Sequence, residues 1–305
     1  MKPKVVVIVG PTASGKTALS IELAKKIDGE IISSDSMQIY KDMNIGTAKV
    51  TEEEMQGIKH YLIDFLSPNE RYTVSDFKKD CEKAIEEIVA KGKVPIVVGG
   101  TGLYVNSLIY GIEYQDMNFD EKYRNKLMKK ADTPEGLEKL WLEANKIDPE
   151  AMKKISKNDK KRIVRVLEIY KATGKNKTEQ EILSKQKELK YDFKVFGINM
   201  DREKLYERIN LRVDKMIEQG LEHEVEQIID KYEEFPTAMQ GIGYKEMLDY
   251  FDGSLTYQQM VDKIKQESRR YAKRQLTWFR KNEEIIWLDA EKKLNDNINI
   301  ILGEL

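Results

Sequence analysis

The sequence predicts an α/β fold in which helices flank a parallel sheet and an all-helical domain is inserted into the chain. Apolar, β-branched runs at residues 4–9 and 94–98 alternate with helical patterns, as in strand–helix–strand crossovers. Residues 116–191 carry no strand pattern and are rich in Lys, Glu, Leu and Ala. Strand patterns return at residues 194–200 and 285–288. We therefore expect a core that is built from both ends of the chain.

The predicted domains follow from this change of pattern. Residues 1–115 and 192–305 form the core, and residues 116–191 form the helical insertion. Within the core, Lys4–Val9 is a continuous apolar run that ends at a glycine, which is typical of a strand buried on both faces. Glu30–Ser33 is predicted as a second, shorter strand.

Helices are predicted where apolar residues recur every three or four positions. One helix follows Lys16, another covers residues 73–91, and a basic helix lies near residues 261–279. A longer apolar stripe predicts one long amphipathic helix that carries Ile209, Val213, Ile217, Leu221, Val225 and Ile228.

Composition excludes several classes of protein. The 305 residues include 52 Lys+Arg and 53 Asp+Glu, a formal net charge of −1. No apolar run approaches the roughly 18 residues of a membrane-spanning helix, and the run after Met1 is too short for a signal peptide. The single cysteine, Cys81, excludes an internal disulfide, and His60 and His223 leave little for a zinc site. We expect a monomeric, cytoplasmic protein with no membrane partner.

Positive charge is concentrated in two runs despite the neutral total. Residues 153–165 and residues 265–281 each carry seven Lys or Arg against one acidic residue. Local charge matters more than net charge to an anionic partner, because salt screens distant charges. Each run is either a solvated helix face or a contact surface for a polyanion, and both interpretations stay open.

A phosphate-binding motif lies between the first strand and the first helix. It matches G-x-x-x-x-G-K-T in full and comprises Gly10, Pro11, Thr12, Ala13, Ser14, Gly15, Lys16 and Thr17. Backbone N–H groups of such a loop and the helix N-terminus hold an anion. Lys16 is expected to reach phosphate oxygens, and the Thr17 hydroxyl suits the cofactor Mg²⁺. The motif predicts a P-loop NTPase-like core that binds a polyphosphate.

A carboxylate follows the second strand, and a threonine follows the third. Asp35 comes directly after Ile31–Ser34, whereas the strand at residues 94–98 ends in Gly99, Gly100 and Thr101. Ligands bind at the carboxyl ends of such strands, so both side chains are candidates for the site. Asp35 has three open interpretations: an orienter of Mg²⁺, a general base, or a capping carboxylate.

The chain resembles the bacterial tRNA dimethylallyltransferases (isopentenyl-tRNA transferases). The resemblance covers nearly the whole chain and rests on six blocks in family order: Gly10–Thr17, Asp35–Tyr40, Gly99–Tyr104, Asn158–Arg165, Gln240–Lys245 and Tyr271–Arg280. The Asp-Ser-Met-Gln and Arg-Gln-Leu-Thr-Trp-Phe runs are the most discriminating of these motifs.

The resemblance implies transfer of the dimethylallyl group from dimethylallyl diphosphate to N6 of the adenosine 3′-adjacent to the anticodon of tRNA. Diphosphate is released, and Lys16, Asp35 and Thr101 are the implied catalytic residues. The implied diphosphate site comprises the P-loop with Arg208 and Arg212. These two arginines are candidates for contacts with the diphosphate or the RNA, and a role in surface ion pairs is equally open.

The implied tRNA contacts are Asp35, Ser36, Met37, Gln38, Thr101, Arg124, Lys161, Arg162, Ile163, Val164, Arg165, Gln240, Gly241, Ile242, Gly243, Tyr244 and Lys245. The helical insertion is expected to clasp the anticodon stem-loop. One departure is Lys161, where the family usually has Gln: its charge favours a phosphate contact over a base-edge contact. Two other functions stay open, a P-loop nucleotide or metabolite kinase and a non-catalytic RNA-binding module.

Overall fold

The computed structural model describes residues 2–112, 120–185 and 188–305. The chain divides into two compact units, which are Met1–Val105 with Lys190–Leu305, and Asn106–Leu189. The predicted insertion at residues 116–191 lies largely within the second unit, and its predicted start lies outside the described residues.

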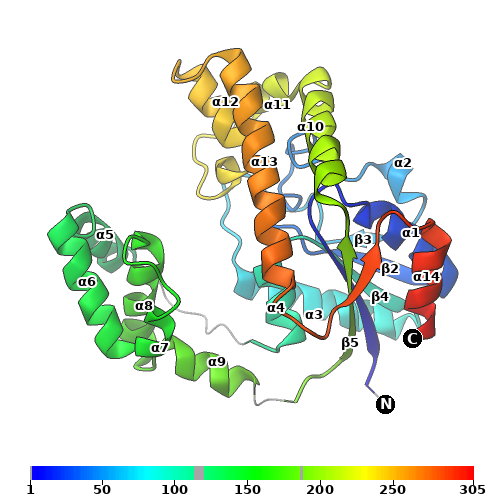
Figure 1. The fold of residues 1–305 in the computed structure, drawn as a ribbon, viewed down its shortest axis with the longest axis horizontal. Coiled ribbons are helices and arrows are strands. Elements are labelled where there is room, and N and C mark those ends of the chain that lie inside the picture. The colour runs from blue at the N-terminus through cyan, green and yellow to red at the C-terminus, as the bar shows by residue number, and fades with distance from the viewer. Residues whose placement is uncertain (1, 113–119, 186–187) are drawn as a thin grey trace. The chain divides into compact units, whose positions relative to one another are not determined.

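A six-stranded parallel sheet forms the centre of the first unit (Figure 1). Its strands are β1 (Lys4–Val9), β2 (Gly29–Ser33), β3 (His60–Tyr61), β4 (Val94–Gly99), β5 (Asp192–Asn199) and β6 (Ile286–Asp289). Their order is β3-β2-β4-β1-β5-β6, and every pair is parallel. The predicted α/β class is confirmed. The two-residue β3 was not predicted, because it is too short to carry a periodic signal.

The position of β1 explains its unbroken apolar run. It lies between β4 and β5, with Val6 opposite Ile96 and Lys194. Neighbours on both edges and helices on the faces leave Val5–Val9 without exposed surface. On one face, α1 (Lys16–Ile27) and α14 (Leu294–Gly303) share an apolar cluster with the strands. Such burial on both faces is the usual environment of a parallel strand.

The remaining helices of the first unit are α2 (Glu52–Met55), α3 (Val74–Ala90), α4 (Gly102–Ile109, which extends past the division), α10 (Arg202–Glu218), α11 (Leu221–Lys231), η1 (Ala238–Gln240), α12 (Tyr244–Phe251) and α13 (Tyr257–Phe279).

The prediction of one long helix through residues 209–228 is wrong. Gly220 interrupts it with a φ of 94°, a conformation that favours glycine, and α11 begins at the next residue. The apolar stripe continues across the break, so the pattern concealed it.

The described residues of the second unit are helical and contain no strand. Its helices are α5 (Glu121–Lys130), α6 (Pro134–Ile147), α7 (Pro149–Met152), α8 (Lys160–Thr173) and α9 (Lys177–Lys185). An apolar core joins α5, α6, α7 and α8, with Leu140, Ala144 and Ile163 among its fully buried members. In the described ranges of both units, no helix has the length and apolar character needed to cross a membrane.

Candidate active site

The P-loop connects β1 to α1, as the motif predicts. Gly15 has a φ of 93°, which a residue with a Cβ rarely adopts. Lys16 Nζ donates hydrogen bonds to the carbonyls of Gly10 (3.0 Å) and Pro11 (2.7 Å). Burial and the neighbouring Arg212 cation lower the pKa of Lys16 to about 8. Lys16 is therefore mostly charged at neutral pH and loses its charge as the pH rises through about 8.

Hydroxyl groups in the loop fit an oxyanion and its metal. The Ser14 side chain is buried, and its Oγ has no hydrogen-bond partner among the described residues. Buried polar atoms are normally paired, so this hydroxyl fits a ligand oxygen. Thr17 is exposed at the first turn of α1 and lines the same cavity as Asp35. These oxygen donors suit Mg²⁺, which binds few protein groups and takes other ligands from phosphates.

Asp35 lies just past β2, and one of its oxygens holds the turn that follows. Oδ1 accepts hydrogen bonds from the amides of Met37 (2.9 Å) and Gln38 (3.3 Å). The other carboxylate oxygen has no hydrogen-bond partner within the described part of the chain. The capping interpretation thus accounts for one oxygen and leaves the second available to a ligand.

Thr101 lies next to this turn, because β2 and β4 are adjacent strands. Its Oγ1 accepts a hydrogen bond from the Ser36 amide (3.1 Å) and lies 3.3 Å from the Ser36 hydroxyl. Tyr271 lines both cavities that Asp35 lines. Burial and the Asp35 charge raise the pKa of Tyr271 to about 12, so Tyr271 stays a neutral phenol. The two predicted strand-end side chains are therefore brought together.

The Arg212 side chain on α10 lines both cavities of the site and does not lie on the open surface. Its Nη1 donates to Thr12 Oγ1 (3.2 Å), and its Nη2 donates to the Thr47 carbonyl (3.3 Å). Burial lowers the pKa of Arg212, while the charges of Asp35 and Glu54 oppose that effect. The surface ion-pair interpretation does not fit Arg212. Arg208, one turn earlier, is exposed and lines the same cavity.

Two cavities meet at Asp35. The larger, about 680 Å³, is lined by the P-loop and by Arg208, Arg212, Lys215 and Gln275. The smaller, about 320 Å³, is lined by Ser36, Met37, Gln240, Gly241, Ile242 and Arg274 among others. Both cavities share Thr12, Asp35, Thr47, Arg212 and Tyr271. The P-loop cavity and a second, half-apolar cavity are thus joined at one carboxylate.

The predicted RNA contacts of the first unit are divided between these surfaces and the core. Gln38 lines the larger cavity, and Lys245 is exposed on α12. Gly243 is a buried backbone residue with a φ of 97° at the start of α12. Tyr244 is fully buried and its hydroxyl donates to Glu224 (2.6 Å), so its side chain offers no surface to RNA.

The second unit separates its predicted RNA contacts in the same way. Lys161 and Arg162 are exposed in the first turn of α8. The prediction for Ile163 and Val164 is corrected, because both side chains are fully buried in the apolar core of this unit. They hold the helix in place and do not offer side chains to RNA.

Two predicted arginines of the second unit converge on a buried acid. Arg124 Nη1 makes hydrogen bonds of 3.0 and 2.9 Å to the two carboxylate oxygens of Glu168. Arg165 Nη1 lies 3.7 Å from Glu168, and burial lowers its pKa. Glu168 positions both guanidinium groups, which are 39% and 34% exposed, at the surface of this unit.

The residues of the site that were not singled out from the sequence include Thr47, Lys215, Tyr271 and Gln275. Tyr271 and Gln275 lie inside the Tyr271–Arg280 block, so the sequence marked their segment but gave neither residue a role. Lys215 follows Arg208 and Arg212 on the same helix. Thr47 acts through its carbonyl, which no side-chain motif reveals.

The fold and the site define a class of protein: a P-loop α/β protein with a carboxylate between the P-loop cavity and a second cavity. Residues 38–282 match the family model described as IPP transferase. The chain belongs to this family, the IPP transferases, which include the tRNA dimethylallyltransferases.

Relatives support this assignment over nearly the whole length. A tRNA dimethylallyltransferase of Acetivibrio thermocellus is 50% identical over 98% of this chain and 97% of its own. One from Bacillus cytotoxicus is 48% identical over 100% of this chain and 96% of its own. Among solved structures, a Staphylococcus epidermidis tRNA isopentenylpyrophosphate transferase matches with a TM-score of 0.73, 45% identity and 99% coverage of both chains. A eukaryotic dimethylallyltransferase acting on tRNA matches with a TM-score of 0.77, 34% identity, and coverage of 94% of this chain and 74% of its own.

Proposed function

We propose that this chain transfers the dimethylallyl group from dimethylallyl diphosphate to N6 of the adenosine 3′-adjacent to the anticodon of tRNA. The single observation that carries the proposal is Asp35, whose carboxylate lies between the P-loop cavity and the second cavity. Transfer from a diphosphate donor to a planar nucleobase needs two such pockets, with a proton-accepting group between them. The relatives named tRNA dimethylallyltransferase support the same reaction.

The reaction balances with the groups that line the two pockets. The N6 lone pair forms a bond to C1 of the dimethylallyl group. The C1–O bond breaks, and its electron pair leaves with the diphosphate. The N6 proton passes to the carboxylate oxygen of Asp35 that carries no protein hydrogen bond. Oδ1 stays engaged with the amides of Met37 and Gln38, so the base keeps its orientation.

Charge on the departing diphosphate is stabilised by the P-loop. Lys16, Arg212 and the loop amides face the same cavity, and preorganised donors of this kind lower the barrier where negative charge develops. The Thr17 hydroxyl would hold Mg²⁺ with the phosphate oxygens. When bound, the ion supplies further charge stabilisation to the leaving group.

Thr101 and Tyr271 lie near Asp35, on the side of the site where the acceptor base would bind. Thr101 accepts a hydrogen bond from the Ser36 amide, and Tyr271 lines both cavities. The half-apolar second cavity suits a purine that has left the base stack, because a base within a stacked loop does not reach a recessed carboxylate. Exposed cations on α13 of the first unit suit RNA phosphates, and so do those on α8 of the second unit, each unit taken by itself. Cytoplasmic location and a monomeric state remain predictions.

The experiment combines the protein, Mg²⁺, dimethylallyl diphosphate and an anticodon stem-loop RNA, with mass spectrometry of the RNA as the readout. The expected result is one added C5H8 unit on one adenosine. A parallel reaction with labelled ATP and small acceptors tests the kinase alternative, which the relatives do not favour. Phosphoryl transfer at ordinary kinase rates with no prenylated RNA would overturn the proposal.

A further inference from the structure

The buried carboxylate of Glu224 on α11 takes no part in the chemistry described above. Only 8% of the residue is exposed. Its Oε2 accepts hydrogen bonds from the amides of Asn44 (2.8 Å) and Ile45 (2.7 Å). Its Oε1 accepts from the Gly46 amide (3.0 Å) and the Tyr244 hydroxyl (2.6 Å). One carboxylate thus gathers four neutral donors, three of them from a single loop, and charge-assisted bonds of this kind are strong.

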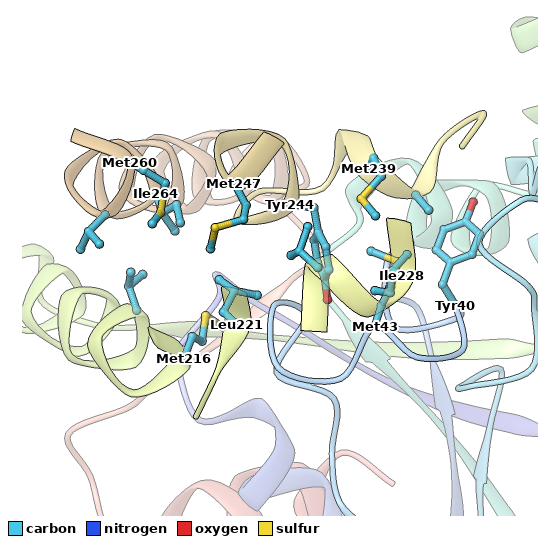
Figure 2. Close-up of a cluster of buried hydrophobic side chains, with 14 of the residues drawn as sticks. Tyr40, Met43, Met216, Leu221, Ile228, Met239, Tyr244, Met247, Met260 and Ile264 are labelled. Carbon is cyan, nitrogen blue, oxygen red and sulfur yellow. The ribbon is translucent and has the colours of Figure 1, made fainter. Parts of the chain in front are cut away.

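The loop of residues 44–48 is also packed against the ring of Tyr244. A Cβ at Gly46 would lie 2.5 Å from Cε2 of that ring. Figure 2 shows Tyr244 within an apolar cluster that includes Met43 and Leu221, and the ring is fully buried. A ring that is packed on all sides cannot move aside. The hydrogen bonds of Glu224 and the ring of Tyr244 therefore restrict the loop to one conformation.

The opposite side of this loop reaches the site. The Thr47 carbonyl accepts hydrogen bonds from Arg212 Nη2 (3.3 Å) and from Gln38 Nε2 (3.2 Å). Gln38 Nε2 also donates to the Ala48 carbonyl (3.1 Å). Thr47 lines both cavities. The position of the Thr47 carbonyl oxygen therefore affects the Arg212 guanidinium and the side-chain amide of Gln38.

We propose that Glu224 is a positioning residue of the transferase site. Its carboxylate fixes the loop of residues 44–48, and through the Thr47 carbonyl the loop holds Arg212 toward the diphosphate. The inference rests on the proposed function for the identity of the ligand. It explains why an anion is buried on a helix whose other polar residues are exposed or partly exposed, and why Tyr244 belongs to a motif although its side chain is buried.

A conservative substitution tests the carboxylate without removing volume. In Glu224→Gln, one oxygen becomes an NH2 group that faces backbone N–H donors, so hydrogen bonds are lost and two donors oppose each other. The matched control is Glu226→Gln on the same helix, whose side chain is 54% exposed. The measurements are the affinity for inorganic pyrophosphate by calorimetry, KM and kcat for transfer, and Tm.

The decisive readout is a double-mutant cycle with Arg212→Ala. We expect Glu224→Gln to weaken pyrophosphate binding and raise KM for dimethylallyl diphosphate by about tenfold in the wild-type background. In the Arg212→Ala background the same change should cost less than about twofold, because the residue through which it acts is gone. Glu226→Gln should match the wild type in both. Equal losses in both backgrounds, or a lowered Tm with unchanged affinity and KM, would overturn the inference.

A second variant covers the case in which Glu224→Gln does not fold. Tyr244→Phe removes one of the four hydrogen bonds and keeps the ring, so a smaller loss of affinity with the same dependence on Arg212 is expected. Additive losses for Tyr244→Phe would contradict the inference. The pyrophosphate measurements need no turnover. A wild-type protein that binds pyrophosphate but transfers no prenyl group would therefore defeat the proposed function, while the cycle still decides the role of Glu224.

Discussion

Gln275 on α13 accepts a hydrogen bond at its Oε1 from the backbone amide of Thr12, at 2.9 Å. Its Nε2 donates to the buried carbonyl of Gly100 at 3.0 Å. One side chain therefore joins the P-loop to the loop that carries Thr101, across residues far apart in the chain. A Cβ at Gly100 would lie 2.0 Å from Nε2, so a larger residue at this position would displace the Gln275 amide from the Gly100 carbonyl.

The first prediction concerns this bridge. Gln275→Ala should lower the free energy of unfolding by about 1–3 kcal/mol, because it leaves a buried carbonyl and a loop amide without partners. It should also weaken pyrophosphate binding, since Thr12 lines both cavities. Urea denaturation and calorimetry measure the two effects. The control is Gln266→Ala, an exposed glutamine of the same helix; equal stability of the two variants would contradict the prediction.

The second prediction concerns the base. Asp35→Asn should lower single-turnover transfer at least ~100-fold, the usual scale for a positioned general base, and leave RNA affinity largely unchanged. The asparagine Oδ1 still accepts from Met37 and Gln38, so the turn is kept. Asp28→Asn, at the opposite end of β2 with a side chain 79% exposed, is the control. Near-normal turnover of Asp35→Asn would remove Asp35 from this role.

The third prediction is a pH dependence of diphosphate binding. Burial and Arg212 lower the pKa of Lys16 to about 8, so the ammonium is present below this pH and is lost above it. A bound diphosphate favours the charged form, which means that binding takes up a proton between about pH 8 and 9 and weakens by up to tenfold per pH unit there. Calorimetry in buffers of different ionisation enthalpy measures that proton uptake.

Lys16→Arg is the control for this pH effect. A guanidinium stays charged throughout this range, so the variant should not show the loss of affinity that belongs to Lys16. Any change that remains in the variant comes from ionisation of the ligand itself. Identical pH profiles for the wild type and Lys16→Arg would show that Lys16 does not titrate in the site.

Local motifs and the parallel sheet explain how much of the site was predictable. The P-loop is contiguous, and Asp35 and Thr101 follow strands whose carboxyl ends share one edge, so their proximity follows from the topology. The contact between Arg212 and the Thr47 carbonyl joins positions 165 residues apart, and no local pattern carries it. Gly220 breaks a helix while the apolar stripe continues through the break. Ile163 and Val164 lie within a recognised motif but support the core beneath it.

The last prediction separates RNA contact from ordinary surface charge in the second unit. Lys161 and Arg162 are exposed, whereas Arg124 and Arg165 lie against Glu168. Charge reversal of both, Lys161→Glu with Arg162→Glu, should weaken binding of an anticodon stem-loop and reduce the slope of log K against log salt by about 2, because each cation lost from a phosphate releases about one fewer counterion. The control reverses two exposed lysines of α6 instead, Lys139→Glu with Lys146→Glu, for the same change in net charge. If both pairs changed the slope equally, the effect would come from net charge, and the start of α8 would face solvent.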